Sequence, residues 1–285
     1  MQAVYGAGAL IVAAAGNEAE RGNAPSFPAA WPHVLSVAAL NEALAPASFS
    51  SRNAAVDIAA PGQNVPLDTP VALDPDGTPD GVRVDSGTSF ASPIVAGAAA
   101  WIWSSRANLS NGQVGDVLRE SAQDVGAPGY DPQTGFGLVN IPKALVAPTP
   151  LNDPLEPNDD IAFVDGTAFR TPDPYVWRGF PHGPIRASVD EIEDPIDVYR
   201  IRVPAHRSAL VQLRTTFGDA DLFVFPGSRR TLQGTPLGRS VKKGRRTDSI
   251  TVRNTSAVAR RFYVAIDSAS SASLNSAYSL NFRRR

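Results

Sequence analysis

Short apolar runs dominate the first half of the chain. Residues 9–15, 34–40 and 56–60 are such runs, and each is followed by turn-forming residues such as Gly, Asn or Pro. Strands that are covered on both faces of a parallel sheet have this pattern, because neither face meets water. Residues 88–105 are apolar nearly all round and predict a buried helix, in which Pro93 is tolerated because it lies near the first turn.

Three weaker signals predict short helices around these elements. Residues 2–4 resemble the last turn of a helix that stops near Gly6. Ser110 and Gln113 form a capping-box pattern that opens a helix ending near Ser121, and Asn140 caps a last short helix. Residues 61–85 are rich in Asp, Pro and Gly, so we expect a long loop there.

The second half has a different pattern. Residues 147–160 contain four prolines and no apolar periodicity, which predicts a stiff, solvated linker. Short segments of alternating polar and apolar residues then follow, at 197–203, 209–213, 221–225, 249–253, 261–266 and 278–282. The predicted fold is therefore an α/β domain over residues 1–146, followed by an all-β sandwich over residues 161–285.

Composition narrows the possible functions. The 285 residues carry a net charge of −2 and no cysteine, which excludes disulfides, thiolate metal sites and a cysteine nucleophile. No apolar run is long enough to span a bilayer, and the first residues lack a signal-peptide pattern. Residues 1–150 contain 6 basic and 13 acidic residues, whereas residues 151–285 contain 20 and 15. We interpret the basic residues of the second half as parts of solvated strand edges and of a charged tail rather than as a nucleic-acid interface.

Residues 86–93 carry the main candidate chemistry. Ser89 is flanked by small residues at the point where a loop becomes the apolar helix, so its oxygen would face the positive end of a helix dipole. The alternative is that this serine only caps the helix. Asn17 follows the first apolar run, where an ordinary turn residue is the alternative to a functional amide.

The two segments together resemble the subtilisin-like serine peptidases (subtilases). Ala14-Ala15-Gly16-Asn17 and residues 87–93, Gly-Thr-Ser-Phe-Ala-Ser-Pro, match the oxyanion and serine motifs of that family. Further matches follow in the family's order at residues 49–53, 57–62, 95–100 and 135–140. On this resemblance, residues 1–146 are the C-terminal portion of a subtilisin-like catalytic domain.

The resemblance implies a role for each matching residue. Ser89 would be the nucleophile that forms an acyl-enzyme, and Asn17 would donate to the oxyanion. Ala14, Ala15 and Gly16 would line the primary specificity pocket, with Ser26 near its base. Such small walls suggest a pocket that accepts a large apolar side chain.

The sequence departs from the family in its acid and base. In subtilases the catalytic Asp and His precede the Ser, and the segments D-[ST]-G and H-G-T-H have no counterpart before Ser89. Of the three histidines, His33 lies in a predicted loop, while His182 and His206 lie in the second half. We therefore expect a truncated, inactive fragment whose first domain does not fold stably alone, because its sheet would expose an apolar edge.

The second half resembles, more loosely, the pre-peptidase C-terminal domain of secreted bacterial peptidases. The match rests on residues 156–159, 194–199, 219–225 and 278–280. It implies a secreted or cell-envelope protein and an accessory domain without an active site of its own.

No cofactor is required by these motifs, and calcium is the one ion to consider. Asp74, Asp76 and Asp80 are weak calcium candidates, and the pairs Asp159-Asp160 and Asp219/Asp221 are others. We favour the interpretation that all of them are solvated turn acids. By the family alignment, backbone oxygens of Ala29, Trp31 and Val34 form a further weak cation site.

The leading hypothesis is a secreted serine endopeptidase that acts on protein or peptide substrates and has no nucleic-acid partner. The sequence predicts no particular oligomeric state. The alternative is a non-catalytic binding protein in which the β-sandwich performs recognition. A serine esterase is a third option, but its nucleophile motif G-x-S-x-G does not fit, because Ala91 stands two residues after Ser89.

Overall fold

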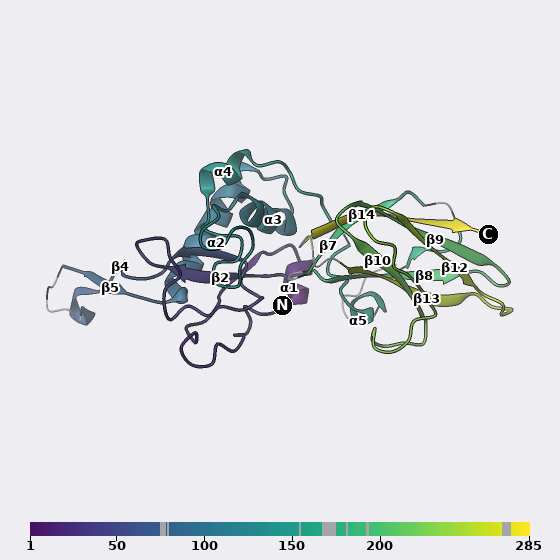
Figure 1. The fold of residues 1–285 in the computed structure, drawn as a ribbon, viewed down its shortest axis with the longest axis horizontal. Helices are drawn as coiled ribbons and strands as arrows, with labels where there is room; N and C mark the ends of the chain where they lie inside the picture. Colours follow the sequence, from purple (N-terminus) through teal and green to yellow (C-terminus); the bar gives the residue numbers. More distant parts are fainter. Residues whose placement is uncertain are drawn as a thin grey trace. The chain divides into compact units, whose positions relative to one another are not determined.

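The computed structural model describes residues 1–74, 78, 80–153, 155–166, 175–180, 182–191, 194–269 and 275–285. They form two compact units, Met1–Pro150 and Leu151–Arg285 (Figure 1). Each unit encloses a hydrophobic core of its own. Among the described residues, no helix has the length and apolar character that a membrane span requires.

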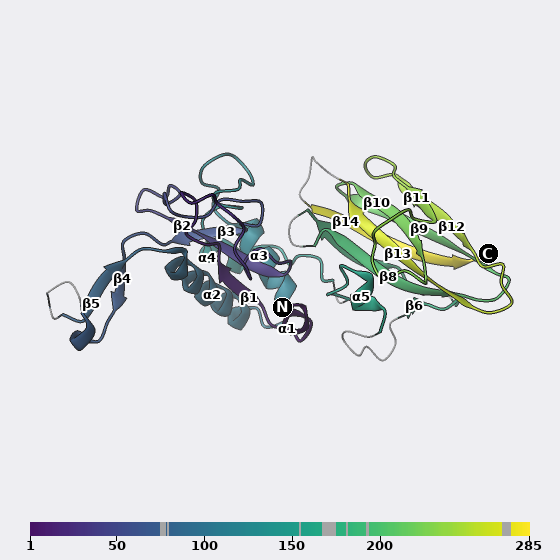
Figure 2. The ribbon, with the colours of Figure 1, turned by 90° about the horizontal axis from the view of Figure 1, so that it is seen from below.

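The first unit is built on a parallel sheet of three strands in the order β1-β2-β3 (Figure 2). These strands are β1 (Ile11–Ala14), β2 (Val34–Leu40) and β3 (Ile58–Pro61). All seven residues of β2 are buried, because this central strand has a neighbour on each edge and apolar residues against both faces. β1 pairs only with β2 among the described strands and is half-buried. The unit is an α/β structure.

The helix α2 (Thr88–Ser105) packs along this sheet (Figure 2). Its residues Val95, Ala98 and Ile102 are almost completely buried in a core that they share with strand residues such as Val37. The shorter helices are α1 (Gln2–Gly6), α3 (Asn111–Ser121) and α4 (Ile141–Val146). Ser110 and Gln113 form the reciprocal capping box that opens α3, with N···O distances of 3.0 and 3.2 Å.

Residues 61–85 are more regular than the expected loop. They contain the antiparallel hairpin of β4 (Val65–Asp68) and β5 (Val82–Asp85), with a 3₁₀ turn at Val71–Leu73. No residue of either strand is buried, so the pairing rests on backbone hydrogen bonds rather than on an apolar face. The loop prediction was wrong for these strands, although Val82-Arg83-Val84-Asp85 alternates apolar and polar residues and was a usable signal.

The glycine-rich segment after α3 closes the unit against β3. Ala59 exchanges backbone hydrogen bonds with Gly137 and Val139 at 2.8 and 2.9 Å, and Phe136 N–H donates to the Asp57 carbonyl at 2.8 Å. A Cβ on Gly135, whose φ is +63°, would lie 2.1 Å from the Asp57 carbonyl carbon. Only glycine therefore fits at position 135.

The second unit contains two sheets, a five-stranded one in the order β11-β10-β13-β8-β6 and a four-stranded one in the order β12-β9-β14-β7. All neighbours are antiparallel except the pair of β6 and β8. The strands are β6 (Tyr175–Trp177), β7 (Ile185–Asp190), β8 (Ile196–Val203), β9 (Ser208–Phe217), β10 (Ala220–Pro226), β11 (Gly238–Ser240), β12 (Thr247–Arg253), β13 (Arg260–Ser268) and β14 (Asn275–Arg284).

Three of these strands were not expected from the sequence. β6 and β11 have only three residues each, which is too short for an alternation to be recognised. β7 does alternate, since Ile185, Ala187 and Val189 are buried and the residues between them are not. This alternation was a usable signal that the sequence analysis missed.

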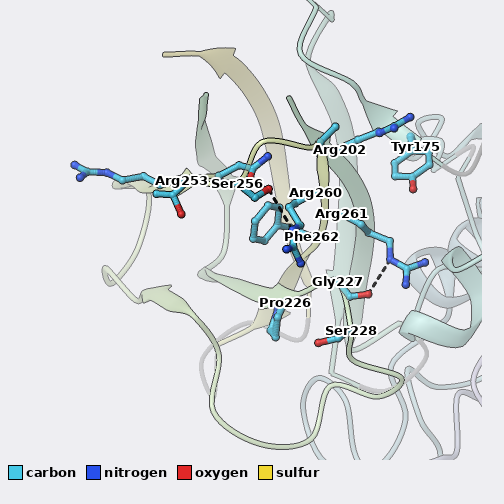
Figure 3. Close-up of a pocket in the computed structure, with 13 residues that line it drawn as sticks. Tyr175, Arg202, Pro226, Gly227, Ser228, Arg253, Ser256, Arg260, Arg261 and Phe262 are labelled. Atoms are coloured by element: carbon cyan, nitrogen blue, oxygen red, sulfur yellow. Dashed lines mark hydrogen bonds between the residues drawn. The ribbon is translucent and has the colours of Figure 1, made fainter. Parts of the chain in front are cut away.

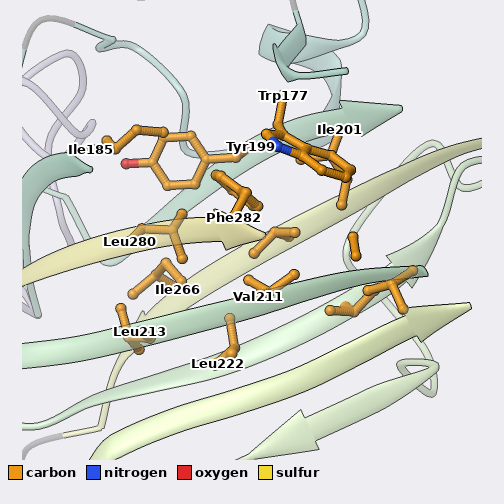
Figure 4. Packing of buried hydrophobic residues seen from close by; sticks show 14 of the residues in the cluster. Trp177, Ile185, Tyr199, Ile201, Val211, Leu213, Leu222, Ile266, Leu280 and Phe282 are labelled. Atoms are coloured by element: carbon orange, nitrogen blue, oxygen red, sulfur yellow. The ribbon is translucent and has the colours of Figure 1, made fainter. Parts of the chain in front are cut away.

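The inner faces of the two sheets share one apolar core (Figure 4). It includes Trp177, Tyr199, Ile201, Val211, Leu213, Leu222, Ile266, Leu280 and Phe282. The outer face of the five-stranded sheet is covered in part by the short helix α5 (Ile161–Val164), whose Ile161 packs with Val198 and Tyr263. Where α5 covers them, β8 and β13 therefore have apolar residues on both faces of the sheet instead of an apolar and a polar face.

The predicted linker at 147–160 differs from the structure in its second part. Asn158 is 1% exposed, and its backbone and side-chain carbonyl oxygens both accept from the Val198 N–H, at 2.9 and 3.2 Å. Residues near 158 therefore belong to the second unit and are not solvated. Local composition cannot reveal this, because the partner strand lies 40 residues away.

The core of the second unit should respond strongly to truncation. Leu213 is 0% exposed, so Leu213→Ala should lower the free energy of unfolding of this unit by about 2–5 kcal/mol. Leu237 is 61% exposed, and Leu237→Ala is the matched control, with an expected change within about 0.5 kcal/mol. Urea unfolding of the full chain, monitored by hydrogen exchange of the β9 amides, measures the change in the free energy of unfolding for both variants. Equal changes in the two variants would contradict the assigned core.

Candidate active site

Ser89 is the second residue of α2, and its side chain is exposed. The residue before the helix, Gly87, has no side chain that could accept from the first N–H groups of the helix. Another part of the chain must therefore satisfy them. The positive end of the helix dipole lies at this turn, where it would stabilise negative charge on or near Ser89.

Asn17 supplies one of the missing acceptors from 71 residues earlier in the chain. Its Oδ1 accepts from the Thr88 N–H at 3.0 Å and from the Thr88 hydroxyl at 2.9 Å. Because Oδ1 carries both bonds, Nδ2 is the end of the amide that remains able to donate. A Cβ added to Gly87 would stand 3.5 Å from that nitrogen. The exposed amide of Asn17 thus places an N–H donor beside the turn that carries Ser89.

Thr88 and Gly87 tie the ends of two strands to this helix. The Thr88 hydroxyl is buried, donates to Asn17 and accepts from the Gly16 N–H at 3.2 Å. The Gly87 N–H donates to the carbonyl of Gly62, the residue directly after β3, at 2.7 Å. A side chain on Gly62 would lie 2.6 Å from the Ala39 Cβ, so glycine is required for this approach. The carboxyl ends of the parallel strands and the start of α2 therefore meet at one edge of the sheet.

Two of the four predicted pocket residues lie together. A Cβ on Gly16 would be 3.2 Å from the Ser26 Cβ and 2.9 Å from the Ser51 Oγ. Ala14 is half-buried at the end of β1, whereas Ala15 is 2% exposed and its side chain is part of the core. Ala15 can therefore line a pocket only with its backbone. The substrate-binding role of all four residues stays a prediction.

The first unit offers Ser89 no imidazole base among its described residues. His33 immediately precedes β2, while Ser89 lies at the carboxyl edge of the sheet. Seven strand residues at about 3.3 Å each separate these edges by roughly 20 Å. His33 is also buried and stacked on Tyr5, with 4.2 Å between ring centroids. The other two histidines, His182 and His206, belong to the second unit.

The described calcium candidates in the first unit are not gathered into a group of ligands, although both carboxylate oxygens of Asp74 are buried and accept from no described donor. Asp80 accepts from the Val82 N–H at 2.9 Å and so shapes the start of β5. Asp74 is half-buried after the 3₁₀ turn, and Asp76 lies outside the described residues. Neither Asp74 nor Asp80 belongs to a group of three or more described acidic or histidine residues at ligand spacing.

The candidates in the second unit have mostly structural contacts. Asp160 caps α5 by accepting from the Ala162 N–H at 3.3 Å. Asp219 accepts from the Gly244 N–H at 2.9 Å. Burial, and then the charge of Asp219, raise the pKa of Asp221 to about 6. The contacts of Asp160 and Asp219 need no ion, whereas the burial and neighbouring charge that raise the pKa of Asp221 do not supply such a contact.

A different acidic cluster has the spacing of a metal site. Carboxylate oxygens of Asp153, Glu156, Asp194 and Asp197 all lie within 4.8 Å of one another. Among the described residues, no hydrogen-bond donor contacts the buried Oδ1 of Asp194 or of Asp197. Four carboxylates at this spacing match the oxygen ligands that calcium prefers. This cluster was not predicted from the sequence, although Asp153 with Glu156 and Asp194 with Asp197, each pair three residues apart, were a signal for it.

Burial dominates the electrostatics of this cluster. It raises the pKa of Glu156 and of Asp194 well above the usual range, and the neighbouring carboxylates add to the effect. Burial also raises the pKa of Asp197 to about 6, although the Tyr278 hydroxyl donates to its carboxylate. A divalent cation would remove this cost by compensating the negative charges.

Comparison with known proteins identifies what the first unit is similar to. Residues 1–137 match the model of the Subtilase family. The "Halolysin-like extracellular serine protease Nep" of Natrialba magadii is 38% identical over 138 residues, which cover 48% of this chain and 23% of that protein. The "Subtilisin" of Bacillus pumilus is 38% identical over 139 residues, which cover 48% of this chain and 46% of that protein.

Among solved structures, a lanthipeptide protease covers 50% of this chain and 52% of its own, with 29% identity and a TM-score of 0.45. The matched part of this chain spans less than half the length of the curated relatives named above. The residues matched to the family model, 1–137, all lie in the first unit.

The double hydrogen bond to Asn17 Oδ1 separates two roles of this residue. Asn17→Ala removes the acceptor for the first turn of α2 and should lower the free energy of unfolding of the first unit by about 1 kcal/mol. Asn17→Asp keeps the acceptor and adds a negative charge at the helix start, so it should be neutral or stabilising. Thermal unfolding of both variants checks this; equal destabilisation would contradict the capping role.

Proposed function

We propose that residues 1–146 are part of a subtilisin-like serine endopeptidase that hydrolyses peptide bonds through an acyl-enzyme on Ser89. The observation that carries the proposal is the arrangement at the start of α2, where Ser89 is exposed and Asn17 is held by Thr88 with Nδ2 able to donate. The match of residues 1–137 to the Subtilase family supports it.

In the proposed reaction, the Ser89 oxygen attacks the carbonyl carbon of the scissile peptide bond while a base takes its proton. The carbonyl oxygen becomes an oxyanion, which would accept a hydrogen bond from Asn17 Nδ2 and lie near the positive end of α2. The intermediate collapses to an acyl-enzyme as the proton passes to the leaving amine, and water then releases the acid by the same steps in reverse.

The base must come from polypeptide other than the described part of the first unit, and the sequence before Ser89 also lacks the D-[ST]-G segment that carries the family's acid. No described imidazole of this unit is near Ser89, since His33 lies at the opposite edge of the sheet. Without a base, the hydroxyl stays protonated near neutral pH and attacks poorly. We therefore propose that this chain alone is an inactive portion of the peptidase.

The surface of the first unit is consistent with a further segment packed on it. β1 has a strand partner on only one edge among the described strands. On α2, Ile94 and Trp101 are 37% and 58% exposed. An unpaired parallel strand beside an exposed apolar helix face is unusual for a complete domain, because both surfaces favour burial.

For substrates, we propose proteins or peptides with a large apolar side chain at the cleavage site. The small residues around Gly16, including Ser26 and Ser51, leave the walls of the predicted pocket short. We further propose that the second unit is a β-sandwich accessory domain and that the protein acts outside the cell. The name of the Natrialba relative contains the word extracellular, in agreement with this setting.

We also propose that the cluster of Asp153, Glu156, Asp194 and Asp197 holds a structural calcium ion. The ion would link residues before α5 to the start of β8 and so fasten the beginning of the second unit to its sheet. Waters and backbone oxygens would complete the six to eight ligands that calcium takes.

Labelling with a fluorophosphonate probe tests the serine. This chain alone should form no adduct on Ser89, because the base is missing. A chimera in which the part of a subtilisin that carries its Asp and His precedes Met1 should be labelled at Ser89, and Ser89→Ala should abolish the label. Asn17→Asp in the chimera should fold but react about a hundredfold more slowly, a magnitude measured for this donor in subtilisin itself.

Two results would overturn this proposal. Adduct formation on Ser89 in the unmodified chain, at the rate seen in the chimera, would mean that the base lies within this sequence. A folded chimera that cleaves peptides after Ser89→Ala would mean that another group is the nucleophile.

Calcium removal tests the acidic cluster. Calcium at about 100 times its dissociation constant should stabilise the second unit by about 2.7 kcal/mol, a rise of roughly 10 °C in its melting temperature. Asp194→Asn should abolish this rise, whereas Asp221→Asn, at the other candidate site, should leave it intact. The opposite result would assign the ion to the site at Asp221.

The stability of the metal-free second unit should depend on pH through Asp197. The raised pKa of Asp197 means that its protonated form stabilises the fold below the unfolded-state pKa of about 3.9, and this stability is lost as the pH rises through about 6. With chelator, the melting temperature of the second unit should therefore fall between about pH 4 and pH 6.5, on either side of which Asp197 adds little further change. Saturating calcium should remove most of that fall.

A further inference from the structure

The second unit contains a pocket of about 780 Å³ with an unusual lining (Figure 3). Four of the thirteen lining residues are arginines, and none is acidic. They are Arg202 on β8, Arg253 at the end of β12, and Arg260 and Arg261 at the start of β13. The volume lies in the range of ordinary ligand sites.

The strand register places two of these charges opposite one another. Arg202 and Arg261 are direct partners in the antiparallel ladder of β8 and β13. Like charges in this position repel each other and destabilise the sheet. Within the described part of the chain, none of the four arginines forms an ion pair that would offset the repulsion. An anion bound between them would do so.

The guanidinium groups remain available to a ligand. Arg261 donates only its Nε, to the Gly227 carbonyl at 2.8 Å, and Arg260 only its Nε, to the Ser256 hydroxyl at 3.2 Å (Figure 3). These bonds hold the two side chains in place. Their terminal nitrogens, and all those of Arg202 and Arg253, donate no hydrogen bond to a described residue, and the Arg261 guanidinium lies 5.6 Å from the centre of the Tyr263 ring. Such forks bind carboxylate, sulfate or phosphate through two parallel hydrogen bonds.

The loop that forms one wall is rigidly held. Asn254 is 4% exposed and donates from Nδ2 to the carbonyls of Val203, Pro204 and Val258, at 3.0, 3.0 and 2.8 Å. Its Oδ1 accepts from the N–H and the hydroxyl of Ser256. A wall fixed in this way loses little entropy on binding, which favours affinity for a ligand of defined shape.

The positive charge continues beyond the pocket. Ladder pairs Arg253↔Ser208 and Arg284↔Ala209 place the ends of β12 and β14 beside the start of β9. Asn254 joins this end to the last residues of β8. The same end of the unit thus carries the pocket arginines together with Arg207 and the basic residues 283–285. A ligand with many charges would gain from this extended surface.

The acidic residues lie toward the opposite end. After residue 197 the sequence has four, namely Asp219, Asp221, Asp248 and Asp267. They stand at the starts of β10 and β12 and near the end of β13, away from the arginine pocket. Lys242 and its basic neighbours belong to that end as well, where the Lys242 N–H donates to Asp248 at 3.1 Å. Asp165 is near Arg200, which donates to its carbonyl, but does not line the pocket.

We propose that this pocket binds an anionic polysaccharide that carries sulfate or carboxylate groups. The lining suits such a chain, because hydroxyl-bearing Ser228, Thr255 and Ser256 stand among the arginines and no large apolar side chain is exposed there. Nucleic-acid bases would need free aromatic faces. Phe262 is only 9% exposed, and the ring of Tyr175 already contacts the guanidinium groups of Arg178 and Arg200, at 4.6 and 4.2 Å.

Binding of a fluorescent heparin oligosaccharide to the full chain tests the proposal. The double variant Arg202→Gln/Arg261→Gln should weaken binding at least about tenfold, because it removes the opposed pair. The matched control is Arg245→Gln/Arg246→Gln, which removes the same charge outside the pocket lining and should change affinity less than about twofold. Equal losses in the two variants would reduce the effect to net charge and overturn the proposal.

Two comparisons identify the ligand class. Polyglutamate and single-stranded DNA of the same charge should bind more weakly than the sulfated glycan at 150 mM salt, near physiological ionic strength. Tighter binding of either would assign the pocket to that class instead and overturn the glycan proposal, as would the absence of glycan binding.

Thermal unfolding without and with glycan gives a second measurement. Without ligand, Arg202→Gln/Arg261→Gln should melt higher than the native chain, because the repulsion is gone. The glycan should raise the melting temperature of the native second unit by more than that of the variant. A variant that melts lower without ligand would contradict the argument from the opposed charges.

Discussion

The arrangement at Ser89 depends on one buried side chain, that of Thr88. A helix that begins after glycine has no side-chain cap of its own, and its first N–H groups need acceptors. Asn17 provides one of them, and the Thr88 hydroxyl joins Asn17 to the backbone of Gly16. The end of β1 and the start of α2 are therefore fixed to each other by polar contacts rather than by packing alone. This junction fixes the position of Ser89, which directly follows Thr88 in α2.

The same junction explains which functions the first unit can supply. A parallel sheet gathers the carboxyl ends of its strands at one edge, and the donor amide and the serine both lie there. His33 lies at the other edge because it precedes its strand instead of following it. Three strands and one helix thus position the proposed nucleophile and the proposed oxyanion donor. The base of the proposed reaction would have to come from a further segment at the same edge.

In the second unit, the alternation of strand direction has an electrostatic consequence. Adjacent antiparallel strands bring the end of one beside the start of the next, so charges at both positions accumulate at one end. Arginines gather in this way around the pocket, and carboxylates gather at the opposite end and near the start of β8. Each accumulation is unfavourable by itself. This cost makes both places natural sites for a ligand of opposite charge.

The sequence alone determined the elements whose pattern is local. The apolar runs of the sheet, the long helix that follows Gly87 and the capping box at Ser110 follow from side-chain periodicity and capping chemistry within a few residues. The motifs around Asn17 and Ser89 identified the candidate residues as well. Tertiary structure alone decided how they meet, because the bonds among Gly16, Asn17 and Thr88 span more than 70 residues. It also decided that Asn158 is buried, that four carboxylates form one cluster and that Arg202 faces Arg261, since strand register brings together charges that are far apart in the chain.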